Sequence, residues 1–118
     1  MRAILAVAVL AFAVAGCASS STNSSGTITH AGSGDGTDTA TKDCGTKVNY
    51  SQTTAVTSGS VAFTVKDSSG ATKFTGGASS SSGSAMSQPL TGNGGVWSLT
   101  AVRSGGFGGS FTVSLSCG

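Results

Sequence analysis

Gly109-Ser110-Phe111-Thr112-Val113-Ser114-Leu115, close to the C-terminus, is the stretch that decides the fold class of this chain. Its large apolar residues stand at every second position, with a serine or a threonine between them. Successive side chains of a β-strand point to opposite faces of the sheet. This period of two therefore predicts a half-buried strand with its apolar face inward.

The same alternation recurs earlier in the chain, and Gly- and Ser-rich turns separate the runs. Asp67-Ser68-Ser69-Gly70 is typical of a four-residue hairpin turn, and residues 104–109 are expected to be the turn between the last two strands. Pro89 indicates an edge strand or a strand end, because proline cannot donate a backbone hydrogen bond. The expected strands are 47–51, 60–66, 73–75, 86–90, 96–102 and 110–116.

About six short strands, with no helical period after the leader, predict an all-β fold. The expected architecture is a small antiparallel β-sandwich or jelly-roll-like domain. Rows of serine and threonine on the outward faces of these strands are interpreted as a source of solubility.

The N-terminus has the pattern of a bacterial lipoprotein signal. Met1-Arg2 is a short positive region, and Ala3 to Val14 is an unbroken apolar run. Val14-Ala15-Gly16-Cys17 then resembles a lipobox, at which bacteria acylate the cysteine and cleave before it. The apolar run is shorter than the roughly 20 residues of a membrane-spanning helix. An ordinary secretory signal cut near Ala18 is the other alternative.

This resemblance implies a signal peptide over residues 1–16 and acyl chains, such as palmitate, on Cys17. The chains would anchor the protein to a membrane of the cell envelope, on its extracytoplasmic side. In lipoproteins of this kind, an aspartate directly after the acylated cysteine tends to mark inner-membrane retention. Ala18 stands there instead, which favours the outer membrane if the host is Gram-negative.

Acylation of Cys17 leaves two cysteines, Cys44 and Cys117. An even pair in an oxidising compartment predicts one disulfide that closes the domain. Two free thiols, or a bridge to another molecule, are the alternatives.

Residues 17–43 are expected to be the lipidated N-terminus and a disordered, flexible linker. They consist mostly of Ser, Thr, Gly, Asn and Asp, and Ile28 is their only large aliphatic residue, so they bury little apolar surface. The folded β-sandwich domain is then expected to span residues 44–118.

One resemblance concerns the end of the chain. Gly95-Val96-Trp97-Ser98-Leu99, a Gly-rich turn and then residues 109–115 are similar to the closing hairpin of jelly-roll modules appended to secreted proteases. The similarity covers about twenty residues and favours a sandwich. The acidic calcium-binding positions of those modules have no counterpart here.

The inventory of reactive groups argues against an enzyme. The only histidine, His30, lies in the expected linker, where it could not hold a catalytic register. The chain has no glutamate, Asp67 is expected to cap its own turn, and Asp43 stands at the domain border, so no carboxylate pair is available.

No cofactor or metal is expected. Asp35, Asp38 and Asp43 could offer oxygens to calcium, but their spacing does not match an EF-hand. Six Lys and Arg residues against four Asp give no basic stripe for nucleic acid.

Trp97 and Phe107 are the remaining candidates for ligand contact. Trp97 is in phase with Leu99, which favours the core. Phe107 stands among glycines at an expected loop tip, where folding back to cap the sandwich is favoured over an exposed position. The first hypothesis is a non-catalytic, membrane-anchored envelope lipoprotein that binds a protein partner or serves a complex, through an exposed apolar patch. The alternative is a carbohydrate-binding module with an exposed aromatic ring.

Overall fold

The computed structural model describes residues 20–80 and 82–118, with seven strands and no helix among them. All strand pairs are antiparallel. The strands are β2 (Ser20–Ser24), β3 (Thr27–Ser33), β4 (Gly36–Cys44), β5 (Lys47–Lys66), β6 (Thr72–Ser79), β7 (Ser82–Thr91) and β8 (Gly95–Cys117). The leader and Cys17 lie outside the described residues.

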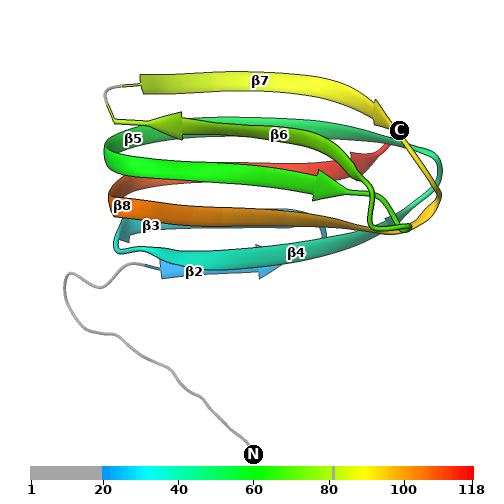
Figure 1. Cartoon of the computed structure of the whole chain (residues 1–118), viewed down its shortest axis with the longest axis horizontal. Coiled ribbons are helices and arrows are strands. Elements are labelled where there is room, and N and C mark those ends of the chain that lie inside the picture. Colours follow the sequence, from blue (N-terminus) through cyan, green and yellow to red (C-terminus); the bar gives the residue numbers. More distant parts are fainter. Residues whose placement is uncertain (1–19, 81) are drawn as a thin grey trace, which may run out of the picture.

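The two longest strands, β5 and β8, bend and run through both layers of a sandwich (Figure 1). One layer has the order β2, β3, the second half of β8, the first half of β5, and β7. The other has the order β4, the first half of β8, the second half of β5, and β6. Leaving β2 aside, this is the pairing order of a jelly roll, and the expected all-β sandwich is confirmed.

Glycines form the bends of these strands. In β5 the register shifts twice between Val56 and Ser60, around Gly59, whose φ is +67°. In β8 the bend contains Gly105 and Gly106, with φ of +69° and +77°. Strands that pass from one layer to the other need such breaks.

The expected closing hairpin is therefore wrong in one respect. Residues 95–99 and 109–115 belong to one strand, and their halves pair with different neighbours in different layers. The Gly-rich segment between them bends the strand from layer to layer and does not reverse it. Residues 47–51 and 60–66 are joined in β5 in the same way.

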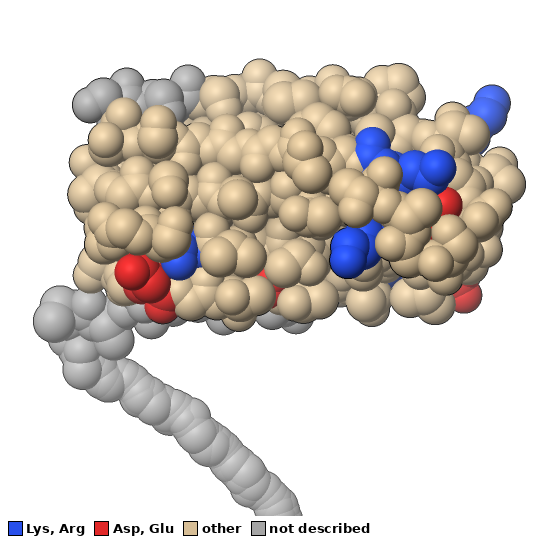
Figure 2. Space-filling model, viewed as in Figure 1, with Lys and Arg blue, Asp and Glu red and all other residues tan. Residues whose placement is uncertain are grey.

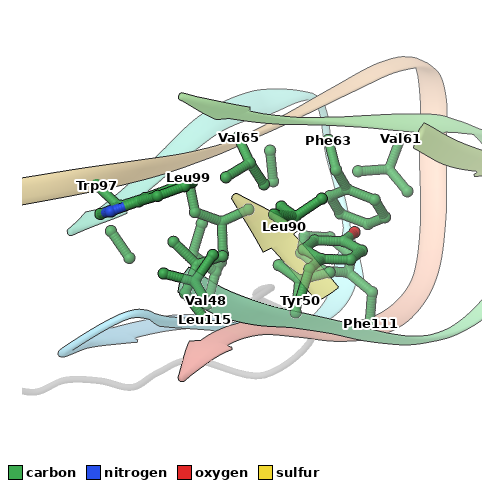
Figure 3. Close-up of a cluster of buried hydrophobic side chains, with 14 of the residues drawn as sticks. Val48, Tyr50, Val61, Phe63, Val65, Leu90, Trp97, Leu99, Phe111 and Leu115 are labelled. Carbon is green, nitrogen blue, oxygen red and sulfur yellow. The ribbon is translucent and has the colours of Figure 1, made fainter. Parts of the chain in front are cut away.

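The core lies between the layers, and the expected apolar rows fill it (Figure 3). Alternate residues of β5 and β8 point inward, and the residues between them point outward. The largest fully buried apolar side chains are Trp97, Tyr50, Phe63, Phe107, Ile28, Leu99, Val48, Val65 and Val113.

A disulfide joins Cys44, at the end of β4, to Cys117, at the end of β8, as expected. These strand ends belong to different layers, so the bond ties the two layers together. It spans 73 positions of sequence, and a closure of this length stabilises the fold by about 4 kcal/mol in the chain-entropy model.

The expectation of a flexible linker over residues 17–43 is wrong for its larger part. β3 pairs with β8 from Thr27 to Ser33, and β4 pairs with β8 from Gly36 to Cys44. The mostly polar composition of residues 17–43 does not reveal that Ile28, His30 and Ala40 all lie on the inward side of their strands, where they are buried. A strand needs only one apolar row and a partner for its backbone, and β8 provides that partner.

In the part of the chain that the structure describes, no helix is long and apolar enough to cross a membrane.

Candidate functional site

Trp97 and Phe107, the two candidates for ligand contact, are both buried. Trp97 is 0% exposed, and its Nε1 donates a hydrogen bond of 3.0 Å to the carbonyl oxygen of Gly45. Phe107 is 1% exposed, because the bend of β8 turns its ring into the core. Core packing, the interpretation favoured for both residues, is confirmed, and the alternative of ligand contact is wrong for both.

A carboxylate fixes the bend that buries Phe107. Asp35, between β3 and β4, accepts hydrogen bonds from the backbone N–H groups of Gly106 (3.1 Å) and Phe107 (2.9 Å). These contacts satisfy donors that the bend takes out of the β-ladder. Asp35 thus serves the fold.

His30 lies in β3 and is 1% exposed, so its expected place in a linker is wrong. Its ring stacks on Phe111, with 5.6 Å between centroids, and meets Phe107 edge-on at 5.5 Å. Burial, and then the positive charge of Arg103, lower the pKa of His30, against smaller opposing effects of Asp38 and a backbone contact at Gly32. The imidazole is held in its neutral form inside the core.

An ion pair stands beside this histidine. Arg103 Nη2 lies 3.3 Å from Asp38 Oδ2, and the two side chains are only 9% and 11% exposed. Arg103 Nη1 also donates to the carbonyl oxygen of Gly34 at 2.7 Å. The pair links β4, β8 and the β3–β4 connection at the bent end of the sandwich.

Asp67 has the structural role expected for it. Its carboxylate accepts hydrogen bonds from the backbone N–H groups of Ser69, Ala71 and Asn93 and from the Ser69 hydroxyl. The bond from Asn93, and then that from the Ser69 hydroxyl, lower the pKa of Asp67 to about 2. The residue fixes its own turn and binds it to the loop before β8.

Two of the three acidic residues weighed for calcium are engaged with protein groups. Asp35 binds backbone N–H groups, and Asp38 pairs with Arg103. Within residues 20–80 and 82–118, no group of three or more His, Cys, Asp or Glu side chains could hold a metal ion.

The outer face of the β3–β8–β5–β7 layer is the most distinctive surface. Its side chains form rows across the strands: Thr29, Thr112 and Thr53 are in register, and so are Thr27, Ser114 and Ser51. Ser51 and Ser114 share a hydrogen bond of 2.7 Å between their hydroxyls. We call the uncharged part of this surface the hydroxyl face; its members are Thr27, Thr29, Ala31, Ser51, Thr53, Ala55, Ala85, Ser87, Ser110, Thr112 and Ser114. Asn49, Ser116 and then Lys47 continue the same outer side toward the ends of the strands.

A shallow hollow of about 170 Å³ lies in the hydroxyl face. Ala31, Ser110 and Ala55 form a row of small residues across three strands, and the larger threonine row stands beside it. No Lys, Arg, Asp or Glu lines the hollow. Its lining residues are Thr29, His30, Ala31, Thr53, Thr54, Ala55, Ser110, Phe111 and Thr112.

The opposite layer also presents hydroxyls, but charges accompany them. Thr39, Thr100, Thr64 and Thr75 form one row across four strands. Asp43 and Lys66 lie on the same outer side, each an even number of positions from a threonine of this row. Figure 2 shows charged side chains scattered over the face in view, with broad uncharged areas between them.

The exposed apolar patch expected for a protein-binding module is not continuous among the described residues. The exposed large apolar side chains there are Met86, Val96 and Val102. Val96 and Val102 are six positions apart on one strand, or about 20 Å. No described aromatic side chain is more than partly exposed, so the ring expected for stacking on a sugar is also not found there.

No protein-family model matches the chain, and no curated protein matches it.

Sequence reasoning found the hydroxyl rows but interpreted them only as a source of solubility. The signal for a distinct face was present in Ser51 and Thr53 on the outward side of their strand and in the alternating Ser and Thr of 110–116. What the alternation could not show is which strands are neighbours, and therefore that uncharged rows from separate segments meet.

Proposed function

We propose that this chain is a lipid-anchored protein of a bacterial cell envelope, with acyl chains on Cys17 holding it to the membrane. Its jelly-roll domain is a non-catalytic interaction or accessory module. In a Gram-negative host the outer membrane is its place. The leader and its lipobox-type end support the anchor, and the fold gives a disulfide-closed module to display.

The observation that carries the interaction role is the hydroxyl face. Its members are threonine, serine and alanine, so they bear hydroxyls and methyls and no charge, and Lys47 lies on the same outer side at the start of β5. A surface of this kind contacts a partner without the cost of desolvating fixed charges. We therefore place the contact with the envelope partner on this face.

Site-specific photo-cross-linking in the intact envelope tests this role. The photoreactive residue replaces Thr53, on the hydroxyl face, or Thr64, on the same strand β5 but on the outer side of the other layer. A recurrent protein cross-linked from position 53 and not from position 64 is the expected result. The same products from both positions, or none from 53, would contradict it.

The anchor has its own test, which is independent of the face. Labelled palmitate should enter the full chain, and Cys17→Ala should abolish the label and release the protein from the membrane. A labelled Cys17→Ala variant would contradict acylation at this residue.

Carbohydrate binding is the second candidate, and the hollow in the hydroxyl face favours it. Hydroxyls of Thr29, Thr53 and Thr112 beside the methyls of Ala31 and Ala55 suit the mixed polar and apolar surface of a neutral sugar ring. Ala55→Leu fills the hollow and should abolish retention on a neutral glycan. Ala62→Leu, an outward-facing alanine of β5 in the other layer, should retain it.

A further inference from the structure

β7 is an edge strand with a free row of backbone hydrogen-bonding groups. It pairs with β5 on one side, and no pairing is recorded on its other side among the described residues. Unpaired N–H and C=O groups at a sheet edge are a template for another strand.

The register shows which residues hold the free groups. Gly92 N–H donates to Thr46 O at 2.9 Å, so even-numbered residues of β7 bond to β5. Pro89 lies opposite Asn49, in the other phase, where its missing N–H costs no bond to β5. The N–H and C=O groups of Gly83, Ala85 and Ser87 therefore point to the free edge.

The other edges are protected by features that β7 lacks. β4 carries Asp38, Lys42 and Asp43, and β6 carries Lys73 and pairs with β5 through a register shift. β2 is only 5 residues long. Charge, irregular pairing and short length all oppose edge pairing.

β7 has no charged residue in its 10 positions. In two copies related by a two-fold axis within the strand, a charged residue at or beside the axis would lie close to its own copy and repel it. An uncharged strand avoids this repulsion. Met86, 37% exposed, adds an apolar side chain at the middle of the edge.

We propose that β7 pairs antiparallel with β7 of a second copy of this chain, about a two-fold axis at Ala85. Ala85 then faces its own copy, and Gly83 faces Ser87 of the other copy. Each of these facing pairs exchanges two backbone hydrogen bonds, which gives about six in total. The small side chains at these positions leave room for the approach, and the two hydroxyl faces join into one continuous surface.

A cysteine at the axis tests this arrangement. In such a pair the two Cα atoms at position 85 are about 5.5 Å apart, which is within the range of a disulfide. The full chain carrying Ala85→Cys is oxidised mildly in its native membrane, and cross-linked peptides are identified by mass spectrometry, which separates them from any bridge through Cys17. Ala62→Cys, exposed on β5 away from every edge, is the matched control.

The expected result is a disulfide between the two introduced cysteines at position 85, formed at least ~10-fold faster than at position 62. Adding Ser87→Pro removes a free-edge N–H without touching the bonds to β5, and should reduce this cross-link ~10-fold while Ser87→Ala does not. Equal yields at positions 85 and 62, or no effect of Ser87→Pro, would overturn the proposal. The photo-cross-links from Thr53 test the function separately, because that side chain lies on the face and not at the edge.

Discussion

At the scale of single residues, Phe107 shows that a glycine-rich context need not mean an exposed side chain. Four glycines flank it, which predicts a loop tip, with folding back onto the sandwich favoured over exposure. In the structure the same glycines let β8 bend sharply and direct the ring inward, where it meets His30 and Phe111. The residue is a core anchor at the bent end of the sandwich.

Phe107→Ala should therefore cost about 3–5 kcal/mol of unfolding free energy, the range for a buried phenylalanine. Urea denaturation of the oxidised protein measures it. Val102→Ala, at a side chain 41% exposed, should cost less than about 1 kcal/mol. Equal effects of the two changes would mean that Phe107 is not in the core.

His30 should make the fold sensitive to mild acid. Burial and Arg103 lower its pKa below 6.5 in the folded state, so the unfolded chain binds the proton more readily. Stability is then fully present above about pH 6.5 and falls as the pH drops from there through the lowered pKa.

Melting temperatures between pH 7.5 and pH 5 check this prediction. The wild type should lose stability over this range, and His30→Leu, which cannot be protonated, should lose less. An identical decline in both proteins would show that His30 does not cause it. The pKa of Asp67 is lowered to about 2, so this carboxylate stays ionised in the folded protein between pH 7.5 and pH 5.

At the scale of elements, the period of two locates the strands of the chain from residue 47 onward, but not β2, β3 and β4. The inward rows of β5 and β8 follow it directly, and the turn at Asp67 and the edge position of Pro89 follow from their backbone chemistry. The sequence does not show that the two halves of β5, or of β8, belong to one strand. A Gly-rich segment between two apolar rows is compatible with a reversal of the chain and with a bend in a single strand. β3 and β4 were missed because their polar composition hides Ile28, His30 and Ala40, which become a buried row only when β8 lies beside them.

Gly59 is the element-scale test of the bend in β5. A Cβ there would lie 2.6 Å from the carbonyl oxygen of Ser104 and 2.7 Å from the amide nitrogen of Phe107, and φ is +67°. Gly59→Ala should lower the unfolding free energy by about 1–3 kcal/mol. Gly45→Ala should change the unfolding free energy by no more than about 0.5 kcal/mol, because a Cβ there would meet nothing within 4 Å. A cost as large as that of Gly59→Ala would show that the strain is not specific to the bend.

At the scale of the whole molecule, the fold separates charge from a neutral surface. Asp67 and the Arg103–Asp38 pair hold the loops and the bent end together. The hydroxyl face, on the layer containing β3 and β7, carries hydroxyls and methyls, and Lys47 lies beyond its end. The candidate site thus depends on β3 being part of the domain. If residues 27–43 were a tether, the hydroxyl face would lose Thr27, Thr29 and Ala31, the side chains that β3 contributes to it.

Hydrogen exchange of the backbone amides in β3 is the most direct test of this account. Ile28 and His30 lie opposite Val113 and Phe111 in the phase that bonds to β8, as the Leu115 N–H to Gly26 O bond of 2.7 Å shows. Their amides should exchange at least ~100-fold more slowly than in an unstructured chain, as those of β5 do. Exchange of both amides at the unstructured rate, with β5 still protected, would make this segment a tether and contradict the domain described here.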